Sequence, residues 1–352
     1  MKYSIIIPVY NRPDEVDELL DSLTRQTLKD FETIIVEDGS QTPCEDICHK
    51  YEQSLDIKYF MKNNSGPGQS RNYGVERATG EYVLILDSDV VVPEGYLQAV
   101  DDELAQNPCD AFGGPDRAAD TFTPTQKAIS YSMTSFFTTG GIRGGKKKLD
   151  KFYPRSFNMG VRRDIYKKLG GFSKMRFGED IDFSIRIFKA GCRCRLFPGA
   201  WVYHKRRTDF RKFWRQVFNS GIARINLYKK YPESLKPVHL LPAVFTVGVI
   251  FLLLTAIAGI VATTVLFEKG HGMEQALPMA VTIAALSPIM LYAAIIFLDA
   301  NSKTGSMKIA ALSVRAAFTQ LMGYGCGFVK AWWQRCVLGK GEFEAYKKNF
   351  YK

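Results

Sequence analysis

One stretch, Glu81 to Val92, constrains the fold of this chain more than any other. Its sequence is EYVLILDSDVVV, and Tyr82 to Leu86 form a continuous apolar run that predicts a strand buried on both faces. The triplet Asp87-Ser88-Asp89 follows. Alternate side chains of an extended chain share a face, so Asp87 and Asp89 project together past the strand's carboxyl end, where open α/β sheets bind ligands. Two carboxylates there favour Mg²⁺ or Mn²⁺ carried on a diphosphate, and the plainer alternative is a polar turn that caps the strand.

Two apolar runs indicate whether this basic chain binds nucleic acid or a membrane. The formal charge is +11, and the basic residues gather in Gly144–Lys151, in Lys205–Lys230 and in the C-terminal tail. Such clusters favour either nucleic acid or an anionic membrane surface. Val238–Phe267 and Ala276–Leu298 contain no Asp, Glu, Lys or Arg, and each exceeds the roughly 20 residues that cross a bilayer. We therefore predict a membrane protein and no nucleic-acid partner.

The first residues of the chain do not resemble a signal peptide. Their apolar run is short, and Pro8, Asn11 and Asp14 interrupt it. We therefore expect the N-terminal domain on the cytoplasmic face of the cell's inner membrane. The seven cysteines show no CxxC zinc spacing, so free thiols are expected in that reducing compartment.

Strands and helices alternate along the first ninety or so residues. The predicted strands before Tyr82–Leu86 are Lys2–Val9, Phe31–Val36 and Ile57–Phe60, and the helices between them begin near Asn11, a possible N-cap, and near Gly66. This β-α-β-α-β-α-β order predicts an α/β fold with a doubly wound, mostly parallel sheet. No GxGxxG or GxxxxGK[ST] motif is present, which argues against a dinucleotide oxidoreductase or a P-loop NTPase.

Three motifs occur in an order typical of one enzyme family. SIIIPVYNR, VEDGS and GPGQSRNYGVERATGEYVLILDSDVVVP together resemble the family 2 glycosyltransferases of the GT-A fold, over residues 3 to about 230. The resemblance implies a nucleotide-sugar donor, with a UDP-sugar expected, and inversion at the anomeric carbon. Glu37 stands where the family often has Asp, at the position that is not expected to touch the base.

The resemblance also implies which residues bind the donor. They lie at or near the strand ends: Pro8, Val9, Tyr10, Asp38, Arg71, Asp87, Ser88 and Asp89. Asp38 is expected on the base and Arg71 on the nucleotide. Asp87 is expected near the ribose and the metal, and Asp89 is expected to ligate the metal.

Two further candidates lie later in the chain. Glu179-Asp180 begins a predicted helix, and acidic residues in a first turn complement the helix dipole without any chemistry. The resemblance implies instead that these two residues form the family's catalytic Glu-Asp motif, with Asp180 as the general base. His204 follows the last predicted strand and is either structural or a third metal ligand, since imidazole with carboxylate suits Mn²⁺.

The predicted organisation has four parts. They are a GT-A catalytic domain (1–207), an amphipathic interfacial helix and linker (208–237), two transmembrane helices (238–298), and an interfacial or re-entrant segment with a basic tail (299–352). The tail is expected in the cytoplasm because basic flanks stay inside. Within the first part, Gly140–Lys148 predicts either a solvated loop or an acceptor loop whose lysines meet a phosphate or anionic lipid headgroups.

These features predict a membrane-anchored inverting glycosyltransferase of cell-envelope polysaccharide synthesis. Its acceptor is expected to be a hydroxyl of a glycan or lipid-linked glycan, with metal-assisted departure of the diphosphate and a carboxylate base. The QxxRW motif of processive synthases is absent, which favours single addition. Two alternatives stay open: a polyprenyl-phosphate glycosyltransferase, and a membrane-tethered sensor of nucleotide-sugars or glycans without catalysis.

Overall fold

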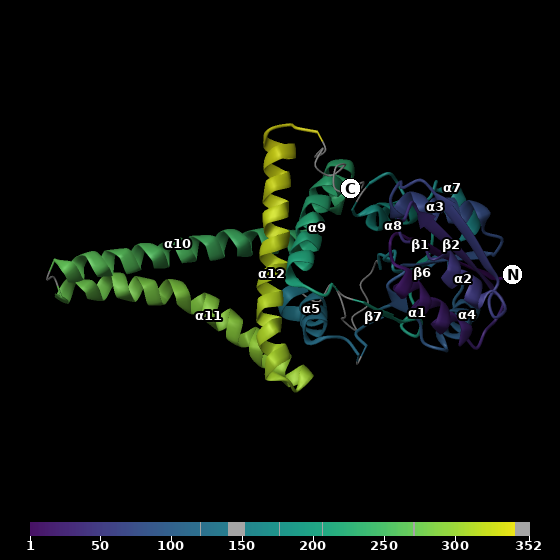
Figure 1. The fold of residues 1–352 in the computed structure, drawn as a ribbon. Helices are drawn as coiled ribbons and strands as arrows, with labels where there is room; N and C mark the ends of the chain where they lie inside the picture. Colours follow the sequence, from purple (N-terminus) through teal and green to yellow (C-terminus); the bar gives the residue numbers. More distant parts are fainter. Residues whose placement is uncertain (120, 140–151, 176, 206, 270–271, 342–352) are drawn as a thin grey trace. The chain divides into compact units, whose positions relative to one another are not determined.

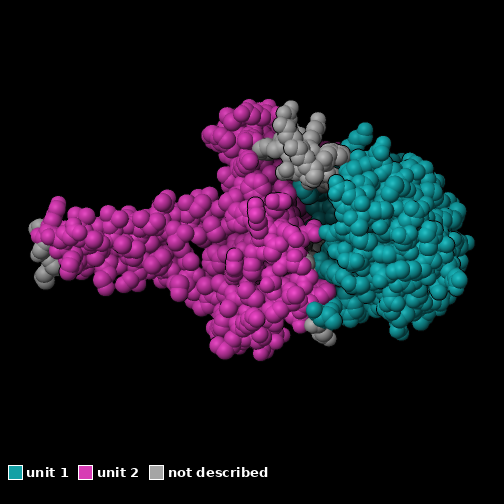
Figure 2. Space-filling model, in the orientation of Figure 1, with its two compact units in different colours: residues 1–121, 146–205, 342–352 teal, residues 122–145, 206–341 magenta. Residues whose placement is uncertain are grey.

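The structure, a computed structural model, describes residues 1–119, 121–139, 152–175, 177–205, 207–269 and 272–341. The chain forms two compact units, of which one spans 1–121 and 146–205 and the other spans 122–145 and 206–341 (Figures 1 and 2). Along the sequence, the chain therefore passes from the first unit into the second, returns to the first, and then enters the second again. The predicted Gly140–Lys148 loop lies outside the described residues, as does the tail after Gly341.

The first unit is built on a seven-stranded sheet of order β3-β2-β1-β4-β8-β6-β9. Four parallel strands form one half: β1 (Tyr3–Val9), β2 (Phe31–Asp38), β3 (Ile57–Lys62) and β4 (Tyr82–Leu86). The other half contains β8 (Asn158–Arg162), β6 (Ala111–Gly113) and β9 (Cys194–Leu196), and β8 runs antiparallel to both β4 and β6. The predicted doubly wound, mostly parallel sheet is confirmed.

Helices cover both faces of this sheet because side chains alternate along each strand. On β1, Ile5 and Ile7 pack into one apolar cluster, and Ile6 packs into a second cluster on the opposite face. The helices of this unit are α1 (Pro13–Thr24), α2 (Glu45–Tyr51), α3 (Pro67–Arg77), α4 (Tyr96–Gln106), α7 (Arg163–Lys168) and α8 (Glu179–Lys189). A second, three-stranded sheet of order β5-β10-β7 joins β5 (Val90–Val91), β10 (Val202–His204) and β7 (Asp116–Arg117).

Asn11 does not cap helix α1, contrary to the prediction. The cap position belongs to Arg12, and Asn11 has a left-handed backbone with φ of 52°. Its side-chain oxygen instead accepts hydrogen bonds from the backbone N–H groups of Gln41 and Thr42. Asn tolerates this conformation better than most residues, and its short amide can satisfy a neighbouring turn.

The second unit is helical. Its helices are α5 (Pro124–Thr134), α6 (Phe136–Thr139), α9 (Phe210–Lys230), α10 (Leu241–Glu268), α11 (Ala276–Thr304) and α12 (Met307–Trp332), with short helical turns at Pro232–Ser234, Pro237–His239, Gly272–Gln275 and Trp333–Val337. Two of the described helices, Pro237–Glu268 and Ala276–Thr304, are long and apolar enough to cross a membrane, judged by length and composition. Helix α12 runs crosswise to the α10–α11 pair (Figure 1).

Helices α9 and α12 approach each other closely through glycines. A Cβ atom on Gly221 would lie 2.2 Å from the carbonyl oxygen of Tyr324, and one on Gly327 would lie 2.0 Å from that of Phe218. Only glycine fits at such crossings, and small residues of this kind let helix backbones meet in membrane proteins. Helix α5 also belongs to this unit, because the Tyr131 hydroxyl donates to Asp299 of α11 over 2.5 Å.

Candidate active site

The candidate donor-binding residues gather at one edge of the sheet. Strand β1 lies between β2 and β4, so its last residues Pro8 and Val9 lie between Asp38, which ends β2, and Asp87, which follows β4. Pro8 and Val9 are buried, and Tyr10 beyond them is exposed. This arrangement follows from the parallel order, because the carboxyl ends of parallel strands share an edge.

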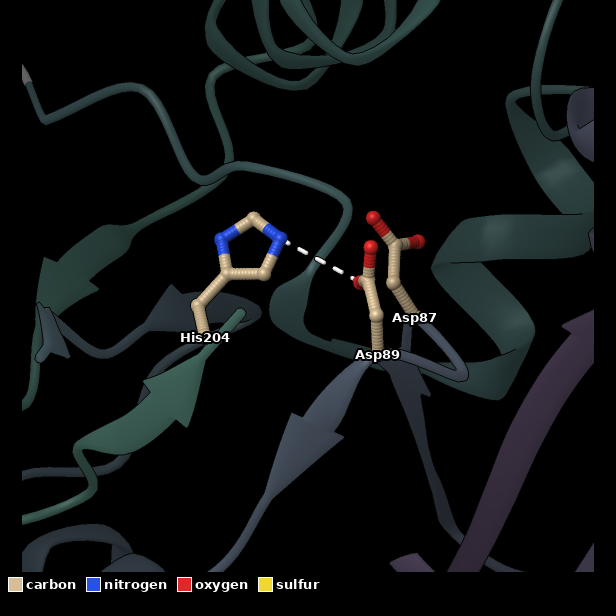
Figure 3. A group of neighbouring side chains, drawn as sticks. All are labelled: Asp87, Asp89 and His204. Carbon is tan, nitrogen blue, oxygen red and sulfur yellow. Dashed lines mark ion pairs between the residues drawn. The ribbon is translucent and has the colours of Figure 1, made fainter. Parts of the chain in front are cut away.

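Asp87, Asp89 and His204 form a cluster at this edge. Their ligand atoms all lie within 4.8 Å of one another, and His204 Nε2 is 3.3 Å from Asp89 Oδ1 (Figure 3). Strand pairing explains the meeting, since His204 on β10 is the register partner of Val90, the residue after Asp89. The Phe157 ring stacks on the imidazole at 4.7 Å between centroids and limits its rotation. Ser88, between the two aspartates, is buried.

The chemistry of this cluster fits a divalent cation. Two carboxylates and one imidazole offer the hard oxygen and nitrogen donors that Mg²⁺ and especially Mn²⁺ accept. The three groups come from the end of β4 and from β10, which are far apart in the sequence, and the fold brings their ligand atoms within 4.8 Å of one another. The residues that could hold a cation here are therefore Asp87, Asp89 and His204.

Arg71 lies beneath the cluster and joins two carboxylates. It projects from α3 and is almost completely buried, with Nη2 2.7 Å from Asp87 Oδ1 and Nη1 3.2 Å from Glu179 Oε1. Its guanidinium also lies over the Phe172 ring, 5.2 Å from the centroid. The structure thus places the expected nucleotide contact in an ion-pair network that links the Asp87 strand end to helix α8.

Glu179 and Asp180 both occupy the first turn of α8, but their surroundings differ. Burial, together with the neighbouring Asp180 charge, raises the pKa of Glu179 to about 7, although Arg71 opposes this rise. Asp180 Oδ2 lies 3.2 Å from the Arg155 guanidinium, and Oδ1 accepts the backbone N–H of Ile181. The acidic turn therefore complements the helix dipole and also presents two carboxylates held by different arginines.

Asp38 stabilises the turn that leads into α3. Its carboxylate accepts the backbone N–H groups of Ser65 and Gly66, over 2.9 and 2.8 Å, and forms an ion pair with Lys62. The side chain is almost fully buried. Any contact between Asp38 and a base would therefore be made by a carboxylate whose position is already fixed.

Sequence reasoning missed three basic residues of this region: Arg12, Lys62 and Arg155. Each one neutralises a predicted site carboxylate, and Arg12 Nη1 lies 2.8 Å from Asp89 Oδ2. For Arg12 a signal existed, because it follows the end of the first strand by three residues and so belongs to the ligand-binding edge. Lys62 and Arg155 reach their partners only through the tertiary fold.

Comparisons with known proteins show what this chain is similar to. The model of Glycosyl transferase family 2 matches residues 4–170. The uncharacterized glycosyltransferase EpsJ of Bacillus subtilis (strain 168) is 28% identical over 212 residues, which are 57% of this chain and 60% of EpsJ. Chondroitin synthase of Escherichia coli is 28% identical over 57% of this chain and 34% of its own length. The chain thus covers less than two thirds of the length of these relatives.

Two further similarities are informative. A poly(ribitol-phosphate) beta-glucosyltransferase of Bacillus spizizenii is 43% identical over 94 residues, 25% of this chain and 15% of that protein. Among solved structures, the mannosyltransferase PcManGT from Pyrobaculum calidifontis, in complex with GDP-Man and Mn²⁺, gives a TM-score of 0.57 at 17% identity. The match covers 95% of this chain and 88% of that one. At this identity the likeness is one of fold, and the fold is GT-A.

Proposed function

We propose that this chain, which carries a glycosyl transferase family 2 domain, is a glycosyltransferase that transfers a sugar from a nucleotide-sugar donor to an acceptor hydroxyl at a membrane, and that the donor is a UDP-sugar. The observation that carries the proposal is the cluster of Asp87, Asp89 and His204 at the carboxyl edge of the sheet. A diphosphate bound there requires positive charge, and these donors suit Mg²⁺ or Mn²⁺. The solved PcManGT complex, which contains Mn²⁺ and GDP-Man, supports the same choice.

We assign the donor's nucleoside to the edge formed by Pro8 to Tyr10 and Asp38. A carboxylate such as that of Asp38 accepts the ring N–H that uracil, thymine and guanine all carry. The buried network of Arg71, Asp87 and Glu179 keeps Asp87 in place beneath the diphosphate. When bound, the cation neutralises charge on the departing diphosphate, and no protein acid is then needed at the leaving group.

The acceptor hydroxyl needs a base on the opposite side of the anomeric carbon. We assign this role to Asp180, with Glu179 as its neighbour in the same turn. The proton moves from the hydroxyl to the Asp180 carboxylate as the new glycosidic bond forms and the bond to the diphosphate breaks. Such a base contributes typically 10²–10⁴-fold to the rate. The Arg155 guanidinium lies 3.2 Å from Asp180 Oδ2, so it must move aside before an acceptor hydroxyl can approach that oxygen.

The same ion pair favours a second candidate, in which the acceptor is a polyprenyl phosphate. A phosphate is already ionised and needs no base, and Arg155 offers a guanidinium that pairs well with phosphate oxygens. With polyprenyl phosphate as acceptor, Asp180→Asn would keep its transfer activity. With a hydroxyl acceptor, the same variant would lose it.

We place the enzyme at the inner membrane, with the catalytic domain on the cytoplasmic side. The support is the pair of helices Pro237–Glu268 and Ala276–Thr304, which are long and apolar enough to cross a membrane, judged by length and composition. A lipid-linked glycan acceptor would then lie in the same membrane as the enzyme.

The proposal is tested by donor binding to the full-length protein in detergent. UDP-, GDP- and dTDP-sugars are titrated calorimetrically with Mn²⁺, with Mg²⁺ and with a chelator. At least one donor should bind in a metal-dependent way, and Asp89→Ala should lose most of that dependence. The matched control is Asp102→Ala, which removes an exposed carboxylate on α4. If donor affinity depends on metal equally in Asp89→Ala and in wild type, this cluster does not bind the metal.

A further inference from the structure

Arg12 occupies the position next to the candidate metal ligand. Its Nη1 lies 2.8 Å from Asp89 Oδ2, and His204 lies 3.3 Å from the other oxygen of the same carboxylate. Glu15 lies farther from the guanidinium, at 3.7 Å. In the free protein, therefore, a fixed positive charge already neutralises the carboxylate that a divalent cation would use.

The chain holds Arg12 there by a defined turn. Asn11 has a left-handed backbone, its N–H donates to Ser40 Oγ over 2.7 Å, and its side chain accepts from Gln41 and Thr42. These bonds tie the β1–α1 turn to the loop after β2, and Pro13 then begins helix α1 at the next residue. The backbone of Arg12 is thus fixed on both sides, and about a third of its side chain is exposed to solvent.

This placement makes the contribution of Arg12 depend on what else is bound. An arginine side chain carries a positive charge at all working pH values. A divalent cation that arrives without a nucleotide is therefore repelled by Arg12 and must break the ion pair between Arg12 and Asp89 to bind. A diphosphate changes the balance. Its oxygens accept the paired N–H groups of arginine, so Arg12 can leave Asp89 to the metal and bind the nucleotide.

We propose that Arg12 couples metal binding to nucleotide binding: it weakens the site for a divalent cation alone and strengthens it for the cation with a nucleoside diphosphate. Arg12 is then a positioning residue for the diphosphate, and it keeps the carboxylates of the free enzyme from holding a cation without donor. The inference rests on the proposed donor site. Coupling of this kind is reciprocal, so each ligand strengthens the other by the same factor.

Equilibrium binding tests this directly, without turnover. Mn²⁺ affinity of the full-length protein in detergent is measured by the electron paramagnetic resonance signal of free Mn²⁺, with and without saturating UDP. UDP affinity is measured calorimetrically with and without Mn²⁺. The variants are Arg12→Gln, which removes the charge, and Arg12→Lys, which keeps it. Arg25→Gln is the control, because Arg25 pairs with Asp21 on the exposed surface of the same helix.

In wild type, UDP should tighten Mn²⁺ binding by about tenfold or more, within the usual range for coupled sites. In Arg12→Gln, Mn²⁺ alone should bind about five times more tightly and UDP with Mn²⁺ about five times more weakly, so that the coupling is nearly lost. Arg12→Lys should keep part of the coupling, and Arg25→Gln should keep all of it.

Three outcomes are decisive. Unchanged coupling in Arg12→Gln, with its unfolding temperature like that of wild type, overturns the role of Arg12. Weaker Mn²⁺ binding in Arg12→Gln without nucleotide also overturns it, because Arg12 would then support the metal site instead of competing with the cation. If wild type itself binds neither Mn²⁺ nor UDP, the proposed donor site fails instead, and the coupling fails with it.

Discussion

Arg71→Gln should destabilise the catalytic unit by an amount that depends on pH. The wild-type guanidinium is almost completely buried and contacts Asp87 and Glu179 at 2.7 and 3.2 Å. Removing one partner of a buried ion pair typically costs about 3–5 kcal/mol, because the remaining charge is left uncompensated. We expect a loss of this size in the free energy of unfolding at pH 8.5.

The pH dependence follows from the raised pKa of Glu179, about 7 against an ordinary 4.5. A carboxyl whose pKa is raised by folding binds its proton more tightly in the folded state, so stability falls as the pH rises from about 4.5 to 7. The difference corresponds to about 3 kcal/mol. At pH 5.5 Glu179 is protonated and no longer pairs with Arg71, so Arg71→Gln should cost clearly less there than at pH 8.5.

Hydrogen exchange of strand β4 measures the effect in the intact protein, since its amides report opening of the catalytic unit alone. The double variant Arg71→Gln/Glu179→Gln should recover part of the loss at pH 8.5, and Arg25→Gln should stay within about 0.5 kcal/mol of wild type. An equal cost of Arg71→Gln at both pH values, or no recovery of stability in the double variant, would contradict the pairing of Arg71 with Glu179.

Three other predictions concern chemistry, packing and topology. Asp180→Asn should keep donor affinity while transfer to a hydroxyl acceptor falls by about two orders of magnitude or more, measured by calorimetry and initial rates; lost donor affinity with intact turnover would assign Asp180 to the nucleotide site. Gly327→Ala should lower the unfolding temperature of the helical unit, because its Cβ would lie 2.0 Å from a carbonyl oxygen, whereas Gly248→Ala meets nothing within 4 Å and should be neutral. Lys340→Cys, in a variant without the native cysteines, should resist a membrane-impermeant thiol reagent in intact cells and react in inverted vesicles. Labelling of intact cells would show that α12 crosses the membrane.

Local patterns were sufficient to predict a doubly wound, mostly parallel sheet and the sheet edge that carries Asp38 and Asp87. Buried parallel strands leave continuous apolar runs, and their ends carry Asp38 and Asp87, so the meeting of these ends follows from topology alone. The sequence left two interpretations of His204 open, a structural residue and a third metal ligand. Its approach to Asp89 depends on the pairing of β10 with β5, which nothing in the local sequence encodes.

Long-range packing explains what the sequence did not reveal. Helix α5 packs with α9 and α12, as shown by the cluster that joins Ile129 to Phe213 and Ala316. No local signal separates residues 122–139 from the catalytic unit that flanks them. Arg315 lies in the segment that was predicted to be interfacial or re-entrant, and α12 continues through it. Its guanidinium lies over the Phe210 ring of α9, 4.5 Å from the centroid, a contact that depends on how the two helices pack.

Nucleotide release from a panel of donors tests the central claim most directly. Purified full-length protein is mixed with UDP-, GDP- and dTDP-sugars, membrane lipid extract as acceptor source, and Mn²⁺, Mg²⁺ or a chelator. We predict release of one nucleotide only when metal is present, and none from Asp89→Ala. Donor binding without release in any mixture would instead indicate a sensor, and equal release with chelator would contradict the metal-dependent mechanism.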